Sequence, residues 1–329
     1  MDPFLAFRIH DEDGRVTAGF ERLSLDDLAP GDVVVRVQWS GINYKDALAA
    51  TGAGKILRRS PLVGGIDLAG EVLVSEDPRF RPGDGVLVVG CGLGEAHDGG
   101  YAEVARVQAD WLVPMPEGYD ARAAMALGTA GFTAALVVDA MERNGQDPAA
   151  GPVVVTGATG GVGSVAVDLL AGRGYEVVAV TGKPDADDWL RGLGAARILR
   201  RAEIDLGRRP LERALWAGAV DTAGGDILAW ILRAADFRAN VGCVGLTAGA
   251  ELHTTVMPFI LRGVNLLGVN STHTPRERRM HVWDRLAGDL RPRHLDRILT
   301  REVALADLPG VLPEYLAGRA RGRTVVRVG

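Results

Sequence analysis

From residue 153 to residue 164 the chain reads Val153-Val154-Val155-Thr156-Gly157-Ala158-Thr159-Gly160-Gly161-Val162-Gly163-Ser164. An apolar strand pattern runs into a turn of small residues and then into a helix pattern. Within it, Ala158-x-Gly160-x-x-Gly163 is a dinucleotide fingerprint in which alanine replaces the first glycine. Small side chains let the backbone approach a pyrophosphate, and the positive end of the helix faces that anion. The stretch predicts dinucleotide binding, although a βα turn that binds nothing can show the same pattern.

Strand and helix patterns alternate around this turn. The expected strands are 153–155, 176–180, 197–199, 219–221, 240–244 and 266–269, and the expected helices are 162–173 and 185–192. Alternation of this kind is typical of a doubly wound parallel sheet. The middle of the chain is therefore expected to be an α/β domain.

The two ends of the chain follow another pattern. From Phe4 to about Asp120, short β-branched runs (32–37, 70–74 and 85–89) follow Gly, Pro and Asp turn signals, which predicts a β-rich, barrel-like unit. An Ala-rich helix is expected between Arg122 and Arg143. Residues 301–329 return to strand-like sequence, with 324–328 as a last strand that closes back on the N-terminal part.

Composition excludes several classes of protein. The 329 residues carry 37 basic and 42 acidic side chains, a net charge of −5, and the basic residues are scattered, which argues against nucleic-acid binding. Cys91 and Cys243 are too few for a disulfide framework or a tetrahedral zinc site. No signal-peptide pattern begins the chain, and no uncharged stretch reaches the about 20 apolar residues of a membrane span. We expect a cytoplasmic protein that binds small molecules.

The end of the strand at 176–180 predicts which dinucleotide binds. A carboxylate there would bind the ribose 2′-hydroxyl of NAD. Here Thr181-Gly182-Lys183 follows, and Arg200 and Arg201 follow the next strand. A hydroxyl and a cation suit a 2′-phosphate, which favours NADP(H), although Lys183 can also be an ordinary solvated turn residue.

Several ordered stretches resemble one family, the medium-chain dehydrogenase/reductase superfamily. More closely, the chain resembles its zinc-free, quinone oxidoreductase-like branch, which contains acrylyl-CoA reductase (NADPH). The stretches that carry the resemblance span nearly the whole chain: Gly41-Ile42-Asn43-Tyr44-Lys45-Asp46-Ala47-Leu48, Gly65-Ile66-Asp67-Leu68-Ala69-Gly70, Asp98-Gly99-Gly100-Tyr101-Ala102-Glu103, Leu127-Gly128-Thr129-Ala130-Gly131-Phe132-Thr133-Ala134-Ala135, the glycine turn, Trp216-Ala217-Gly218-Ala219-Val220-Asp221 and Pro258-Phe259-Ile260-Leu261-Arg262-Gly263-Val264.

The resemblance implies an α/β protein with a GroES-like β-rich catalytic domain and a Rossmann domain with a doubly wound parallel sheet. The implied limits are 1–121 for the N-terminal part of the catalytic domain, 122–270 for the NADP-binding domain and 271–329 for a return segment that completes the catalytic domain. A homodimer joined through Rossmann edge strands is also implied. Zinc enzymes of the superfamily carry Gly-His-Glu where this chain has Gly65-Ile66-Asp67, so no metal is expected.

Site residues are carried over from the family by position. Tyr44 is expected beside the nicotinamide, and Asn43, Tyr44 and Asp67 are the candidate catalytic residues. The candidate NADPH-binding residues are Tyr44, Thr129, Thr159, Gly160, Gly161, Val162, Thr181, Gly182, Lys183, Arg201, Leu246, Ile260, Ser271 and Gly318. Family members often have asparagine near Gly318, where glycine offers only backbone contacts.

The expected reaction is the reduction by NADPH of the activated C=C bond of a short 2-enoyl-CoA such as acrylyl-CoA. Negative charge then develops on the carbonyl oxygen, which calls for hydrogen-bond donors such as Tyr44 and Asn43, while Asp67 and Asp46 are candidates for a proton relay. The alternative role of Tyr44 is stacking on the nicotinamide alone, and that of Asp67 is a turn or cap carboxylate. Alternative functions are a quinone or free-enone reductase and a non-catalytic NADPH-binding protein. The basic run 276–279 is expected to be a solvated helix face, or else to meet coenzyme A phosphates.

Overall fold

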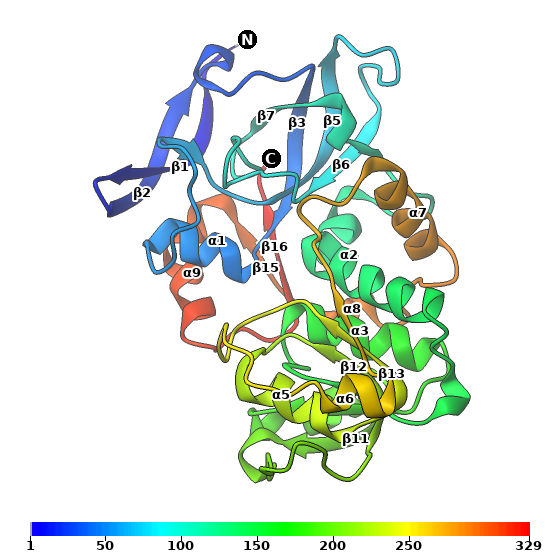
Figure 1. Ribbon diagram of the computed structural model, residues 1–329. Helices are drawn as coiled ribbons and strands as arrows, with labels where there is room; N and C mark the ends of the chain where they lie inside the picture. The colour runs from blue at the N-terminus through cyan, green and yellow to red at the C-terminus, as the bar shows by residue number, and fades with distance from the viewer. Residues whose placement is uncertain (1) are drawn as a thin grey trace. The chain divides into compact units, whose positions relative to one another are not determined.

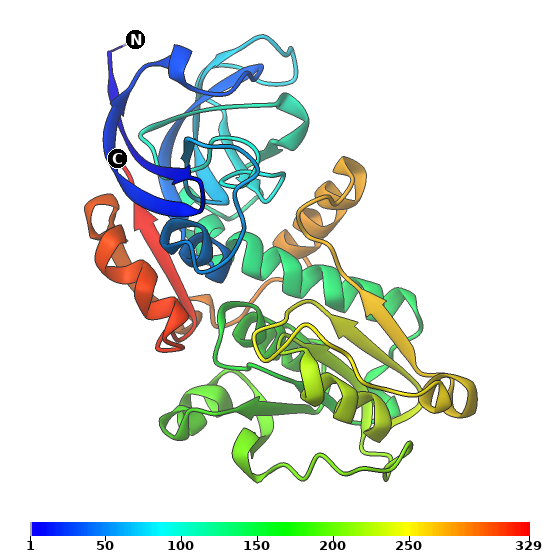
Figure 2. The ribbon, with the colours of Figure 1, turned by 60° about the vertical axis from the view of Figure 1, so that its left-hand side comes forward.

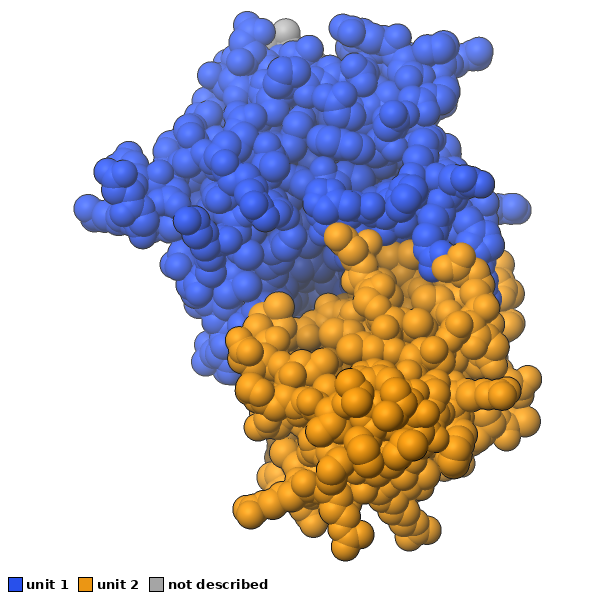
Figure 3. Space-filling model, viewed as in Figure 1, with its two compact units in different colours: residues 1–132, 271–287, 299–329 blue, residues 133–270, 288–298 orange. Residues whose placement is uncertain are grey.

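The computed structural model describes residues 2–329, which form two compact units (Figures 1 and 3). The first unit contains the residues up to Phe132 together with Ser271–Ala287 and Leu299–Gly329, and the second contains Thr133–Asn270 and Gly288–Ile298. These limits differ from the predicted ones in two places. Helix α2 (Ala121–Arg143) is shared between the units, and residues 288–298 return to the second unit, where His294 Nδ1 lies 2.6 Å from Asp168 Oδ1 on helix α3.

The second unit is built on a six-stranded parallel sheet in the order β11-β10-β9-β12-β13-β14. Numbered along the chain, this is the 3-2-1-4-5-6 order of a dinucleotide-binding sheet. The prediction of a doubly wound parallel sheet is confirmed. The strands are β9 (Val153–Val155), β10 (Val177–Thr181), β11 (Ala195–Arg200), β12 (Trp216–Asp221), β13 (Ala235–Cys243) and β14 (Asn265–Gly268), and the helices are α3 (Gly161–Gly172), α4 (Asp187–Gly192), α5 (Gly225–Ala234), α6 (Met257–Arg262) and α8 (Leu295–Ile298).

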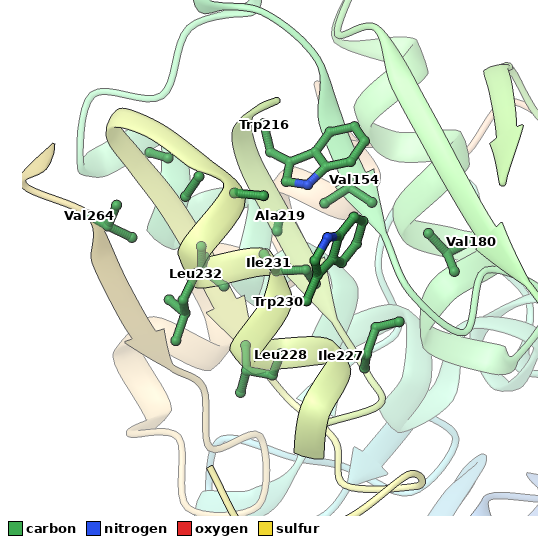
Figure 4. Packing of buried hydrophobic residues seen from close by; sticks show 14 of the residues in the cluster. Val154, Val180, Trp216, Ala219, Ile227, Leu228, Trp230, Ile231, Leu232 and Val264 are labelled. Atoms are coloured by element: carbon green, nitrogen blue, oxygen red, sulfur yellow. The ribbon is translucent and has the colours of Figure 1, made fainter. Parts of the chain in front are cut away.

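Helices cover both faces of this sheet. Helix α5 packs Ile227, Leu228 and Ile231 against the strand residues Ala219 and Val241, in a buried cluster that also contains Trp216 and Trp230 (Figure 4). Adjacent strand residues point to opposite faces. On the other face, a Cβ at Gly242 would collide with Val137 of α2, so that α2 covers the sheet there at a glycine. Helices therefore cover both faces of the sheet, so we expect a ligand to bind at the ends of the strands.

The first unit is a β-rich fold made from both ends of the chain. One sheet has the order β15-β16-β3-β5-β6-β8, with β7 also paired to β3, and a second has the order β2-β1-β4. The last strand pairs antiparallel with β3, which confirms that the tail closes back on the N-terminal part. The strands are β1 (Phe4–Glu12), β2 (Arg15–Leu23), β3 (Val33–Gly41), β4 (Leu62–Val63), β5 (Asp67–Ser75), β6 (Gly85–Val89), β7 (Val104–Val107), β8 (Val113–Pro114), β15 (Leu299–Ala304) and β16 (Arg323–Arg327), and the remaining helices are α1 (Tyr44–Thr51), α7 (Arg276–Ala287) and α9 (Leu308–Leu316).

The strand-like interpretation of residues 301–329 is only partly correct. In the sequence, helix α9 lies between β15 and β16 (Figure 2). Its residues Leu308, Val311 and Leu312 pack against the core residues of the β-rich unit. Apolar residues spaced three and four apart form one face of a helix, and this spacing was missed.

Helix α2 is long and apolar enough to cross a membrane, but 89% of its most apolar window is buried inside the protein. It is also bent, because Gly128 has φ 52° and ψ −155°, which divides the helix into two parts. A buried, bent helix of this kind is typical of the core of a soluble protein.

Candidate functional site

The glycine turn joins β9 to α3 in the second unit. Gly160 is the residue that precedes the helix, and its N–H donates to the Gly157 carbonyl oxygen at 2.8 Å. The first N–H groups of a helix have no partner within the helix, so those of Gly161 and Val162 are available to an anion. Thr159 is buried beside them. The structure therefore brings together the four residues predicted to surround a pyrophosphate, Thr159, Gly160, Gly161 and Val162.

The fit of a dinucleotide is supported by what side chains would do in this turn. A Cβ at Gly163 would collide with the Gly157 carbonyl oxygen and lie 2.8 Å from the Ala158 Cα, so α3 could not begin so close to the turn. Gly157 has φ 56°, and a Cβ there would collide with the Thr222 hydroxyl. Alanine in place of the first fingerprint glycine is compatible with the turn because Ala158 does not adopt a positive φ, and its N–H donates to the Val180 carbonyl oxygen at 3.1 Å.

The turn is fixed to the end of strand β12. The Thr156 hydroxyl donates to Asp221 Oδ1 at 2.6 Å, and the Thr222 hydroxyl donates to the Thr156 carbonyl oxygen at 2.9 Å. Asp221 also accepts from the Gly224 N–H at 2.7 Å, and burial raises the pKa of its carboxyl group. None of these three residues was predicted as part of the site. A polar residue at the end of each of two neighbouring parallel strands was the signal that could have identified them.

The end of β10 carries the predicted 2′-phosphate site. Thr181 is buried, and its hydroxyl accepts from the Lys183 N–H at 3.0 Å. Thr181 pairs with Arg200 across the parallel strands β10 and β11. Lys183 and Arg201 therefore both follow the carboxyl ends of neighbouring strands. Arg200 donates to the carbonyl oxygens of Lys183 and Pro184 at 2.8 and 3.0 Å, which fixes this turn. Arg201 is exposed, and Gly182 has open space around it. No carboxylate follows Thr181 before Asp185.

Leu246 and Ile260 lie at opposite ends of the sheet. Leu246 follows β13 and is 63% exposed, beside Gly224 at the edge that carries the glycine turn. Ile260 is 70% exposed on α6. That helix ends at Arg262, whose guanidinium donates to the carbonyl oxygen of Ala235, the first residue of β13. Ile260 is therefore near the amino ends of the strands, away from the turn, and its predicted place beside the nicotinamide has no support in this geometry.

In the first unit, a buried network is centred on Asp67. This side chain has no exposed surface. It accepts hydrogen bonds from the Thr129 N–H, from the Thr129 hydroxyl at 2.6 Å and from Asn43 Nδ2 at 2.8 Å, and its Oδ2 lies 3.7 Å from Arg323 Nη2. Gly128 permits this approach, because a Cβ there would lie 2.5 Å from Asp67 Oδ2 and 2.6 Å from Arg323 Nη2.

Asn43 and Asp46 complete the network. Asn43 Nδ2 donates to both Asp67 and Asp46, and Asn43 Oδ1 accepts from Arg323 Nη1 at 3.1 Å. Asp46 accepts from the N–H groups of Asn43 and Ile66 at 2.8 and 2.9 Å. Burial, together with the nearby negative charge of Asp67, raises the pKa of Asp46 to about 7. The Asn43 amide donors are therefore occupied within the protein.

Tyr44 stands next to this network but outside it. It is the first residue of α1, and 41% of its surface is exposed. Of the three candidate catalytic residues, it alone is exposed. Ser271 lies beside Gly90, where a Cβ would lie 3.3 Å from the Ser271 carbonyl oxygen, and Gly318 is exposed with φ 68° and open space around it.

Arg323 is the main residue of this network that was not singled out from the sequence. It is 2% exposed and donates to the carbonyl oxygens of Met125, Ala126 and Ile42 as well as to Asn43. Asp67 and Arg323 are 256 positions apart in the sequence, so no local pattern predicts their pairing. The signal in the sequence was an arginine at the start of the last strand, two positions before its valines.

The residues of this unit do not fit a zinc ion. Asp67 is committed to Arg323 and Thr129, and within residues 2–329 no group of three or more His, Cys, Asp or Glu side chains is arranged to hold a metal.

Comparisons with known proteins agree with this architecture. Residues 29–117 match the alcohol dehydrogenase GroES-like domain, and residues 161–287 match the zinc-binding dehydrogenase family. The chain is 51% identical to acrylyl-CoA reductase AcuI of Ruegeria pomeroyi over 319 residues, 97% of this chain and 96% of that protein. It is 45% identical over 326 residues to the putative quinone oxidoreductase YhfP of Bacillus subtilis, 99% of each chain.

Two solved structures show the same fold over the whole chain. The yhdH oxidoreductase of Salmonella enterica in complex with NADP is 49% identical, with a TM-score of 0.95 over 99% of this chain and 100% of that one. The yhfP protein of Bacillus subtilis with NAD bound is 45% identical, with a TM-score of 0.96 over 100% of each chain. The predicted fold class, a GroES-like unit with a Rossmann unit, is confirmed. The chain belongs to the medium-chain dehydrogenase/reductase superfamily, in its quinone oxidoreductase-like branch.

Proposed function

We propose that this protein reduces the activated C=C bond of a short 2-enoyl-CoA, such as acrylyl-CoA, to the saturated acyl-CoA with NADPH and without a metal. The observation that carries the proposal is 51% identity, over 97% of the chain, to a protein named acrylyl-CoA reductase. The 319 matched residues extend over both units.

NADPH is the coenzyme that the second unit suits best. Thr159, Gly160, Gly161 and Val162 would hold its pyrophosphate, and Lys183 with Arg201 would bind its 2′-phosphate, because both cations follow strand ends at the same edge. The coenzyme, when bound, supplies the hydride that the β-carbon of the enoyl group accepts. The solved relatives contain NADP in one case and NAD in another, so the cations at this edge are the features to test.

The network in the first unit positions Tyr44. Because Asn43 is held by two carboxylates and by Arg323, the first turn of α1 is fixed, and with it the direction in which the Tyr44 phenol is presented. In this proposal the phenol O–H donates a hydrogen bond to the thioester carbonyl oxygen, where negative charge develops. Asn43 and Asp67 act as positioning residues, since both are buried and their polar groups are occupied. The Thr129 hydroxyl donates to the carboxylate of Asp67, and Thr129 stays a candidate for coenzyme binding.

The test is a spectrophotometric assay of NADPH oxidation with acrylyl-CoA, a simple quinone and a free enone. We expect the highest kcat/KM with acrylyl-CoA and one saturated acyl-CoA formed per NADPH consumed. Equal or faster turnover of the quinone would favour the second candidate, a quinone or enone reductase, which the 45% identity to a putative quinone oxidoreductase supports. Binding of NADPH without oxidation by any of the three would indicate a non-catalytic NADPH-binding protein.

The proposal includes a homodimer joined at the β14 edge of the second unit. Strand β14 is the last strand of its sheet, and several large apolar side chains near it are exposed: Phe237 at 72%, Ile260 at 70%, Val256 at 65%, Leu261 at 53% and Leu266 at 37%. Exposed apolar residues that gather beside an open sheet edge are typical of an interface.

We also place the protein in the cytoplasm, where its two unpaired cysteines would stay reduced.

A further inference from the structure

The chain carries four cations at the start of α1 and in the loop that follows this helix. They are Lys45 in the first turn of α1, and Lys55, Arg58 and Arg59 in the loop between α1 and β4. We refer to these four residues as the basic rim. The chain as a whole has a net charge of −5, so a local excess of positive charge is unusual for this protein.

Glu95 holds two members of the rim together. Its Oε2 lies 2.6 Å from Lys45 Nζ, and its Oε1 lies 3.4 Å from Arg58 Nε. These two positive charges lower the pKa of Glu95, so its carboxyl group is ionised at neutral pH. The Arg58 N–H also donates to the Glu95 carbonyl oxygen at 2.7 Å, which fixes the loop at this point. The rim is thus a built arrangement with a fixed centre.

Positive charge remains in excess after these pairs are formed. Three of the four cations face two carboxylates: Glu95 pairs with Lys45 and Arg58, and Asp98 lies 4.0 Å from Arg59. Arg58 is 74% exposed and uses its Nε for Glu95, which leaves its terminal nitrogens facing solvent. Lys55 is also exposed. A planar guanidinium with free terminal nitrogens is suited to phosphate oxygens.

Two arginines of the basic run 276–279 make hydrogen bonds within the protein. Arg279 of α7 is 1% exposed, and its Nη1 donates to the Val89 carbonyl oxygen at 2.6 Å, while Arg276 donates to the Leu112 carbonyl oxygen at 2.6 Å. The expectation that residues 276–279 form a solvated face is therefore wrong for Arg279, whereas Arg276 is partly exposed. Arg279 is therefore not available to a phosphate.

We propose that the basic rim binds the phosphates of coenzyme A and thereby selects a coenzyme A thioester as the substrate. The inference rests on the proposed function and goes beyond it by naming Lys55 and Arg58 as specificity-determining residues. Coenzyme A carries a pyrophosphate and a 3′-phosphate, whereas a quinone or a free enone carries no such charge. Tyr44, the neighbour of Lys45 in the sequence, is the residue proposed to meet the reacting end of the same substrate.

The test is calorimetric titration of the full chain with free coenzyme A, for the wild type and for K55Q, R58Q and the double variant. We expect the dissociation constant to rise roughly tenfold for each single variant, the loss of one hydrogen bond to a charged group. R58K should recover part of the affinity, because it keeps the charge. R81Q is the matched control, since Arg81 is exposed in the turn between β5 and β6 of the same unit.

Three results bear on the proposal. Equal affinity for coenzyme A in the wild type and the double variant overturns it. A loss of NADPH affinity in place of coenzyme A affinity also overturns it, because the rim would then serve the other phosphate-bearing ligand. If coenzyme A affinity falls as expected while no variant or wild-type sample reduces acrylyl-CoA, the rim stands and the proposed reaction fails, so the two claims are tested separately.

Discussion

Asp67 caps the second part of helix α2 through Thr129. The Thr129 N–H lies 3.0 Å and its hydroxyl oxygen 2.6 Å from the carboxylate, directly after the bend at Gly128. A negative charge is favourable at the N-terminus of a helix, and this one also faces the guanidinium of Arg323 on the last strand. One carboxylate therefore connects β5, α1, α2 and β16, the elements on which Tyr44 and Thr129 depend for their positions.

Replacement of this carboxylate should strongly destabilise the protein. In Asp67→Asn, the guanidinium of Arg323 stays buried without a counter-charge, a change that typically lowers the free energy of unfolding by about 3–5 kcal/mol. Urea denaturation measures this free energy of unfolding for the wild type and the variant. Arg323→Gln is the partner variant, and the double variant should be less destabilised than the sum of the two single variants. Strict additivity would show that the two groups do not interact.

The glycine turn should lose its coenzyme when Gly163 acquires a side chain. The new Cβ of Gly163→Ala would collide with the Gly157 carbonyl oxygen, so α3 must move away from the turn and its N–H groups away from the pyrophosphate. We expect at least a roughly tenfold rise in the dissociation constant of NADPH, measured by fluorescence titration.

The matched control for this variant is Gly310→Ala in α9, where a Cβ meets open space. This substitution should leave NADPH affinity unchanged and raise stability by up to about 1 kcal/mol, because alanine is the better helix former. If both variants bind NADPH like the wild type, the turn is not the pyrophosphate site.

Local patterns predicted the second unit better than the first. The strand at 153–155 and the helix after it follow from an apolar run and a glycine turn that are contiguous in the sequence, and the structure has them within a residue. The Asp67 network depends instead on pairings between distant segments, such as Asn43 with Arg323, 280 positions apart. Ile260 was assigned by family position, and only the sheet register showed that α6 lies at the other end of β13. Long-range geometry of this kind has no local sequence signal.

Coenzyme preference should depend on Lys183. Lys183→Ala removes a cation from the end of β10 and should lower kcat/KM for NADPH by roughly 10- to 100-fold, the value of one hydrogen bond to a charged group, with little change for NADH. Arg213→Ala is the control, because Arg213 is exposed in the loop that precedes β12, at the opposite end of the strands. An equal loss with both coenzymes would place Lys183 outside the 2′-phosphate site.

The proposed dimer should dissociate when charge is placed beside β14. In Ile260→Glu, a carboxylate replaces an apolar side chain that is 70% exposed in the single chain and that the proposed interface would bury. Sedimentation equilibrium should then show a monomer. Val74→Glu, at an exposed apolar position on β5 of the other unit, should keep the mass of the wild type. A wild-type protein that sediments as a monomer would contradict the dimer directly.

Asp46 should make stability fall as the pH rises toward neutrality. Its pKa is raised to about 7 in the folded protein from the ordinary value of 3.8, because of burial and the charge of Asp67. Between these two values the folded state binds more protons than the unfolded state, so this group favours folding most at low pH, and its contribution is lost as the pH rises through that interval. Asp46→Asn removes the titration. The wild-type free energy of unfolding, minus that of the variant, should therefore fall by up to about 1.4 kcal/mol per pH unit between pH 5 and 7 and then level off. Urea denaturation in 0.5 M salt should give the same slope, since buried charges are little screened, and a difference that does not change with pH would contradict the assignment.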